Sequence, residues 1–207
     1  MKNSIGKRKL IVGADEAGYG PNLGPLVVAV SAWEVHSDLS EAGFLSRVDD
    51  LFSSNTYEPG CTVLPVADSK KLYSTQSGVQ TLESGLLSML RCAGLIPQNL
   101  AELTQSCGNW PLSSKMPWYQ SLEGQQIPVE QDPAEVVRLA GLAKTHLDTQ
   151  EIELLRAQFY LTTETEFNKN VVRLGSKGQY LSLSTLELIT NLLITFDGQY
   201  DEIEVFC

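Results

Sequence analysis

The sequence predicts an α/β fold in which helices cover the faces of a mixed β-sheet. Three observations predict it. Two short apolar segments, residues 9–14 and 26–33, flank a turn rich in glycine and proline, which is typical of paired strands. Later segments repeat leucine at the one-faced spacing of a helix. A final apolar segment at 203–207 returns to the sheet, and such alternation of strands and helices is typical of α/β domains.

The turn between the first two strands could instead be a phosphate cradle of the dinucleotide-binding kind. Such a cradle needs a helix that begins at the glycines. Residues 26–33 are rich in β-branched side chains without helical spacing, and Pro21 and Pro25 stand where a turn favours a fixed φ. The sequence therefore favours strand, turn, strand and argues against a nucleotide fingerprint.

The remaining elements follow in order along the chain. Leucine spacing predicts a helix over residues 75–92 with Ser74 as its cap, and Asp132 and Pro133 are typical of the start of another helix. The other segments are a helical one at 39–52, short apolar ones at 61–66 and 152–162, and helices at 164–172 and 185–196.

Residues 93–133 are the least organised part of what we expect to be a single domain over residues 1–207. This stretch carries five prolines and two tryptophans, Trp110 and Trp118, among polar residues. A loop of this length in a compact domain is usually an insertion or a partner surface. We expect the tryptophans to anchor the insertion to the core, although they could also stack on bases.

Composition excludes several classes of protein. The hydrophobic fraction is 43%, and no uncharged apolar run reaches the length of about 18 residues that a membrane span needs. The basic N-terminus lacks the apolar stretch of a secretory signal, and the four cysteines are scattered without a metal-binding or redox spacing. We therefore expect a cytoplasmic, monomeric protein with reduced thiols.

Two adjacent carboxylates, Asp15 and Glu16, close the first strand. Carboxylates at the end of a buried strand are costly to desolvate unless they are paired or hold a cation. Neighbouring residues of a strand point to opposite faces, so both acids reach one site only if the strand ends there. A solvated hairpin tip is the alternative interpretation.

These residues resemble the signature of type 2 ribonucleases H. The first block has the pattern Gly-x-Asp-Glu-Ala-Gly-x-Gly-Pro at residues 13–21, followed by Gly24 and Pro25. The second block, Asp-Ser-Lys-Lys-Leu, stands intact at residues 68–72. A looser match runs from Asn168 to residue 206. The resemblance implies a ribonuclease H-like fold.

The resemblance also implies a metal-dependent endoribonuclease that cleaves the RNA strand of RNA–DNA hybrids. Asp15 and Glu16 would be the catalytic residues and hold divalent cations, Mn²⁺ or Mg²⁺, with two ions in the site. Ser69 and Lys70 would contact substrate phosphates; a helix-start serine beside a solvated lysine is the alternative.

The backbone triplet that meets the ribonucleotide in the family is Gly18, Tyr19 and Gly20 here. The family has a cation between the two glycines, and this chain has a phenol. Tyr19 therefore puts recognition of a single embedded ribonucleotide in question, because the 2′-hydroxyl separates RNA from DNA at such a site.

The resemblance implies two further aspartates, the first directly after the strand at 203–207. We expect the given chain to be the N-terminal portion of a longer enzyme and to be inactive alone. Asp197 and Asp201 precede that strand and are poor substitutes by geometry.

The net charge of −10 counts against tight, non-specific binding of duplexes. Local basic groups could still form a phosphate-binding surface. They are Lys7, Arg8 and Lys9; Lys70 and Lys71; and Lys169, Arg173 and Lys177. Two other functions stay open: a non-catalytic module that binds hybrids or duplexes, and a plain protein-interaction domain.

Overall fold

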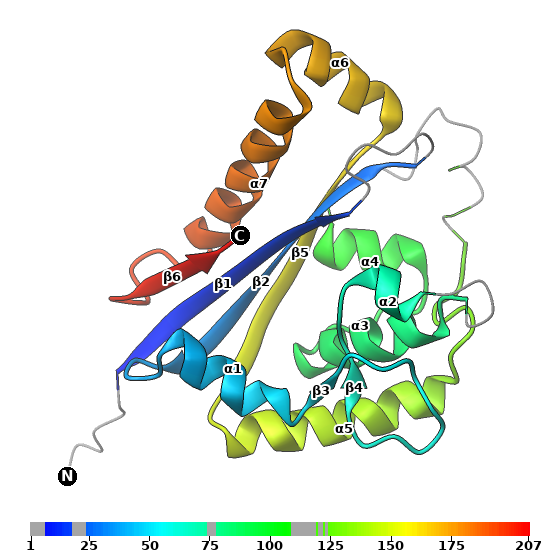
Figure 1. The fold of residues 1–207 in the computed structure, drawn as a ribbon, viewed down its shortest axis with the longest axis vertical. Helices are drawn as coiled ribbons and strands as arrows, with labels where there is room; N and C mark the ends of the chain where they lie inside the picture. The colour runs from blue at the N-terminus through cyan, green and yellow to red at the C-terminus, as the bar shows by residue number, and fades with distance from the viewer. Residues whose placement is uncertain (1–6, 18–23, 74–77, 109–118, 120–121, 123) are drawn as a thin grey trace.

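A mixed four-stranded sheet in the order β5-β2-β1-β6 forms the centre of the molecule (Figure 1). The structure, a computed structural model, describes residues 7–17, 24–73, 78–108, 119, 122 and 124–207. β1, β2 and β5 are antiparallel neighbours, whereas β6 runs parallel to β1. The strands are β1 (Arg8–Ala17), β2 (Leu26–His36), β5 (Glu153–Thr162) and β6 (Ile203–Phe206), and β3 (Phe52–Ser53) pairs separately with β4 (Leu64–Pro65). The predicted mixed α/β class is confirmed.

Helices cover both faces of the sheet. The helices are α1 (Glu41–Asp49), α2 (Ser69–Leu72), α3 (Gln80–Cys92), α4 (Leu100–Cys107), α5 (Pro133–Thr149), α6 (Glu164–Leu174) and α7 (Lys177–Ile194). Figure 1 shows α7 along one side of the sheet, with α3, α4 and α5 on the other. No helix in the described part of the chain is both long and apolar enough to cross a membrane.

The alternation of β1 divides its side chains between two cores. Leu10 and Val12 are fully buried in a cluster with residues of α6 and α7. Ile11 is buried in a second cluster, which is formed with α1, β4 and α5. Because successive side chains of a strand point to opposite faces, the odd-numbered residues of β1 face α3–α5 and the even-numbered residues face α7.

The antiparallel pairing of β1 with β2 confirms the two predicted strands; most of the predicted turn between them lies outside the described residues. The register of this pairing runs from Arg8 opposite His36 to Ala17 opposite Val27. The predicted end of the first strand at residue 14 is wrong, because the ladder continues through Asp15 and Glu16 to Ala17. Cross-strand hydrogen bonds with β2, which a local pattern does not reveal, extend the strand.

Helix boundaries agree with the sequence prediction at the start of α5 and differ from it at α3, α4 and α7. The Asp132 cap of α5 is confirmed, since its Oδ1 accepts from the Ala134 N–H at 2.8 Å. By contrast, α7 begins after Ser176 rather than near residue 185. The expected long loop at 93–133 contains α4, which is capped by Asn99. Ser74 lies outside the described residues, and α3 begins at Gln80.

Candidate functional site

Asp15 and Glu16 lie inside the antiparallel ladder, near the end of β1. Asp15 pairs with Ala29 and Glu16 with Val28. The strand therefore does not end between them, and its pleat directs Asp15 to the side of α3–α5 and Glu16 to the side of α7. The expectation that a chain reversal turns both carboxylates to one face is wrong for this part of the strand.

Both carboxylates are exposed to solvent. The Oδ1 atom of Asp15 accepts a hydrogen bond from the Glu16 N–H at 2.8 Å. This local bond restricts the rotation of the Asp15 side chain. In the parts of the chain that the structure describes, no three side chains of His, Cys, Asp or Glu gather as a group that could hold a metal.

The second motif forms a short capped helix. The Oδ1 atom of Asp68 accepts from the Lys70 N–H at 2.9 Å and so caps α2. Leu72, at the other end of the motif, is buried, whereas Ser69, Lys70 and Lys71 are exposed. The acidic first residue and the apolar last residue thus hold α2 in place. The serine and the two lysines are left facing solvent.

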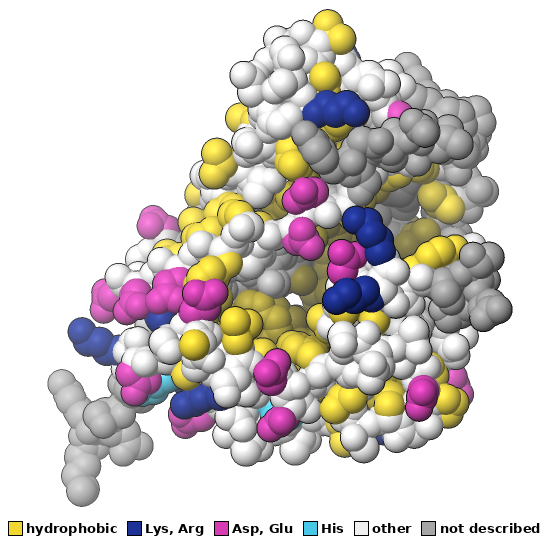
Figure 2. All heavy atoms as spheres, viewed as in Figure 1, with side chains coloured by type: hydrophobic (Ala, Val, Ile, Leu, Met, Phe, Trp, Pro, Cys, Tyr) yellow, Lys and Arg dark blue, Asp and Glu magenta, His cyan; other side chains and the backbone are white. Residues whose placement is uncertain are grey.

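Acidic and basic side chains meet over the region between the end of β1 and α2. Figure 2 shows magenta and dark blue side chains next to one another there, above a hollow with hydrophobic walls. The fold therefore brings the two sequence blocks, which are about fifty residues apart, to the same side of the molecule.

The glycine triplet Gly18, Tyr19 and Gly20 lies outside the described residues. The chain is described again from Gly24, whose φ of +111° is one that glycine adopts readily. The Gly24 N–H donates to Oε1 of Glu164 at 2.9 Å, and the Tyr119 hydroxyl donates to the same carboxylate at 3.1 Å. Glu164 thus joins the start of α6 to the residues before β2. Sequence reasoning missed it, because its partners are 140 and 45 residues away.

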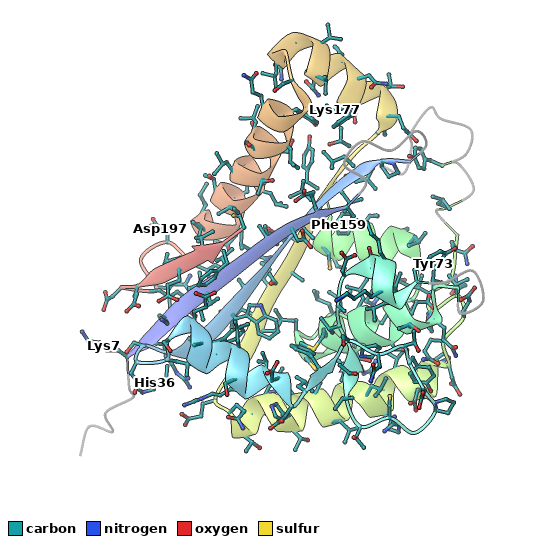
Figure 3. All side chains as sticks on the ribbon, viewed as in Figure 1. Lys7, His36, Tyr73, Phe159, Lys177 and Asp197 are labelled. Atoms are coloured by element: carbon teal, nitrogen blue, oxygen red, sulfur yellow. The ribbon has the colours of Figure 1, made fainter. Side chains whose placement is uncertain are left out.

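The first basic group does not belong to a phosphate-binding surface at the carboxylates. Lys9 is only 2% exposed, and its Nζ lies 2.5 Å from Oε1 of Glu204 and 3.5 Å from Oε1 of Glu202. Arg8 pairs with Glu34 at 3.7 Å. Lys9 precedes Asp15 by six strand residues, or about 20 Å. Figure 3 places Lys7 at the far end of the sheet from Tyr73, which caps the end of α2.

The acidic partners of Lys9 favour its charged form. Burial lowers the pKa of Lys9, but the hydrogen bonds and charges of Glu204 and Glu202 outweigh this effect and raise the pKa above its ordinary value. Lys9 therefore stays protonated and ties β1 to β6. Its role is to hold the parallel strand pair together.

The parallel register of β6 points its carboxyl end toward the carboxylates of β1. Val12 pairs with Val205 and Gly13 with Phe206. β6 therefore runs alongside β1 in the direction of Asp15 and Glu16.

Comparison of the chain with protein-family models, with curated proteins and with solved structures found no match.

Proposed function

We propose that this protein is a metal-dependent endoribonuclease of the cytoplasm, with a ribonuclease H-like fold, that hydrolyses the RNA strand of RNA–DNA hybrids. The observation that carries the proposal is the arrangement at the end of β1. The exposed Asp15 carboxylate of one motif lies on the same side of the sheet as α2, which carries the exposed lysines of the other, and the neighbouring strand β6 runs toward the end of β1. The resemblance of both motifs to type 2 ribonucleases H supports the same function.

The donor set suits a hard divalent cation. Asp15 would hold it; Glu16, which the pleat of β1 directs to the other face, would become a second ligand only if the end of β1 left the ladder with β2. Magnesium in such sites is usually bound by one or two carboxylates together with waters and substrate phosphates. When bound, Mn²⁺ or Mg²⁺ would activate water and offset the charge on the leaving oxygen. The Glu16 N–H orients the Asp15 carboxylate, and this requires no metal.

The exposed residues of α2 are suited to bind the substrate backbone. Ser69 has a hydroxyl that can donate to a phosphate oxygen, and Lys70 has a charge that can pair with it. Asp68 holds the start of the helix and Leu72 anchors its end, so that the exposed residues stay in place. In this proposal Gly18, Tyr19 and Gly20 contact the sugar–phosphate backbone near the scissile bond.

The decisive experiment measures cleavage of a labelled RNA–DNA hybrid by the product of the whole reading frame. We expect cleavage that depends on Mn²⁺ and that falls at least about a hundredfold in Asp15→Asn, which keeps the shape of the side chain but removes its charge. Because Asp15 is exposed, the stability of the variant should stay within about 0.5 kcal/mol of the wild type.

The matched control is Asp197→Asn, which removes an exposed carboxylate away from β1 (Figure 3). It should leave cleavage unchanged. Equal cleavage by wild type and Asp15→Asn would contradict the proposed role of Asp15.

A non-catalytic module that binds hybrids is the second candidate. Tyr19 favours it, because a phenol stands between the two glycines in place of the cation that the family uses. A gel-shift assay distinguishes the two candidates: retained hybrid binding without cleavage in Mn²⁺ would support the binding module. A protein-interaction domain would show neither activity.

A further inference from the structure

A hydrophobic cavity of about 440 Å³ lies between the sheet and the helices α3 and α4. Strands β1, β2 and β5 form its floor, and apolar side chains of the two helices form its opposite wall. This volume is within the range of about 300–1,000 Å³ of small-molecule sites. Residues of three strands and two helices line the cavity, so its shape depends on the fold rather than on one loop.

The cavity exists because small residues meet in one row across the sheet. Gly13 pairs with Ser31, and Ser31 pairs with Ala157. These three positions face the helices but fill little of the space above the sheet. Around them the wall is made of larger apolar side chains: Trp33, Leu86, Met89, Leu90, Leu103 and Phe159.

Direct contacts hold two aromatic walls of the cavity in place. The Trp33 Nε1–H donates to the Ser31 Oγ at 2.9 Å, and the Trp33 ring packs edge-on against Phe44 with 5.8 Å between the ring centres. A Cβ on Gly108 would come within 2.5 Å of the Phe159 ring, so glycine at this position lets Phe159 pack closely. The cavity therefore has a preformed shape, which lowers the entropic cost of binding a ligand.

One carboxylate marks the polar end of the cavity. Asp15 pairs with Ala29, which pairs with Phe159, so the carboxylate lies in the row beside the small residues. Among the described residues that line the cavity, Asp15 is the one with a charged side chain. Burial raises the pKa of the Cys107 thiol in the helical wall, so that this group stays neutral. Figure 3 shows Phe159 close to the end of β1.

We propose that this cavity binds a small amphipathic cation, with an aromatic or alkyl body against the sheet and a protonated amine against the carboxylate of Asp15. An apolar body of ten to fifteen carbon atoms would replace water over the row of small residues. The amine would add charge complementarity at the open end. This binding site goes beyond the proposed nuclease activity, although it shares Asp15 with the proposed metal site.

The test measures displacement of a neutral dye, N-phenyl-1-naphthylamine, whose fluorescence rises in apolar surroundings. Three competitors share one body and differ in the head group: 4-phenylbutylamine, 4-phenylbutanol and 4-phenylbutyrate. We expect the amine to bind about two- to fivefold more tightly than the alcohol, since Asp15 is exposed and its attraction is screened. The carboxylate should bind most weakly.

Two variants test the charged end of the site and its apolar cavity separately. Asp15→Asn should remove the difference between the amine and the alcohol while leaving binding of the alcohol unchanged. Ala157→Phe should fill the cavity and abolish binding of the dye. Ala29→Leu is the second filling variant if Ala157→Phe fails to fold, and the thermal melt of each variant is recorded first.

Equal affinity of the three competitors for the wild type would overturn the proposed role of the carboxylate. Unchanged dye binding by a folded filling variant would overturn the site itself. The assay contains neither metal nor nucleic acid, so its failure and the failure of the nuclease proposal are distinguishable. Asp197→Asn, whose side chain lies outside the cavity lining, should behave as the wild type.

Discussion

At the scale of single residues, the surroundings of a carboxylate decide its role. Asp15 is exposed, and in the described part of the chain its carboxylate accepts one hydrogen bond, from the N–H of the next residue. Glu135 in α5 accepts from Arg138 Nε at 2.7 Å, and the same guanidinium donates to the Cys61 carbonyl at 2.6 Å. Glu135 therefore stabilises the packing of α5, whereas Asp15 is left accessible to a ligand.

The stability of the protein should depend on pH through Glu135. Hydrogen bonds from Arg138, and also from Tyr57, lower the pKa of Glu135. A carboxyl group with a lowered folded pKa contributes stability above its unfolded pKa of about 4.3, and this stability is lost as the pH falls through the folded value. Urea unfolding between pH 6 and pH 3 should show that the free energy of unfolding falls more steeply with acid in the wild type than in Glu135→Gln.

The exposed control Asp197→Asn should follow the wild type over the same pH range. If the unfolding free energy fell equally with acid in the wild type and in Glu135→Gln, the contact of Glu135 with Arg138 would contribute little to folding.

Glu83 supports three backbone groups from a distant segment. Its carboxylate accepts from the N–H groups of Val129, Glu130 and Gln131, at 2.5, 2.9 and 3.0 Å, and it is 8% exposed. Replacement by alanine leaves three backbone donors unpaired, one of them on the buried Gln131, so Glu83→Ala should lose about 3 kcal/mol of unfolding free energy. Chemical denaturation measures the loss.

Glu130→Ala is the matched comparison for Glu83→Ala. The Glu130 carboxylate is exposed and caps α3 through the Val79 and Gln80 N–H groups, at 2.6 and 3.1 Å. A cap of this kind is worth about 1 kcal/mol. A loss for Glu83→Ala no larger than that for Glu130→Ala would contradict the argument from burial.

At the scale of elements, one parallel strand pair depends on a buried charge. β6 is a short edge strand of four residues, and Lys9 joins it to β1 through Glu204 and Glu202. The strand has few side chains with which to pack, because Ile203 and Val205 are 41% and 43% exposed. The ion pair is therefore a substantial part of what holds β6 in register.

Removal of the Lys9 amine should loosen β6 before the rest of the sheet. Lys9→Ala should destabilise the protein by about 2 kcal/mol, and Lys9→Met, which keeps most of the apolar stem, by less. Hydrogen exchange should show faster exchange of the β6 amides in both variants. Lys7→Ala changes an exposed lysine two residues away and should leave exchange unaltered. If the β6 amides of Lys9→Ala exchanged as slowly as those of the wild type, this role of Lys9 would be contradicted.

At the scale of the whole molecule, charge is distributed unevenly. The net charge is −10, yet exposed lysines lie on α2, on the side of the sheet that Asp15 faces. The basic residues Arg8 and Lys9 lie at the start of β1, at the other end of the sheet from α2, and are paired there with Glu34 and Glu204. A nucleic acid should therefore bind locally and weakly, through few phosphate contacts.

The salt dependence of hybrid binding tests this distribution. In the proposed function, Lys70→Ala should weaken binding of an RNA–DNA hybrid and reduce the slope of log K against log salt by about 1, as expected for one lost phosphate contact. Fluorescence anisotropy in Ca²⁺, measured from low to moderate salt, gives the slope. Lys7→Ala should leave the slope unchanged, and equal slopes for wild type and Lys70→Ala would contradict the placement of Lys70 at the phosphates.

Local patterns in the sequence determined the fold class, the pairing of the first two strands and the Asp132 cap, because each depends on neighbouring residues alone. They did not reveal α4 or the full length of β1. They also did not show that Glu130 caps α3 from fifty residues away. The length of β1 and the cap of α3 depend on hydrogen bonds between distant segments, whereas α4 has a local cap, Asn99, in a stretch that the sequence predicts to be a loop.

For the candidate site, the sequence by itself determined which residue types stand together: Asp15 beside Glu16, and Ser69 beside Lys70. Only the tertiary structure decided that the pleat of β1 separates the two carboxylates, that Lys9 is buried in an ion pair, and that Gly13, Ser31 and Ala157 form the floor of a cavity. The physical reason is that strand register and burial arise from contacts across the sheet, which no short segment encodes.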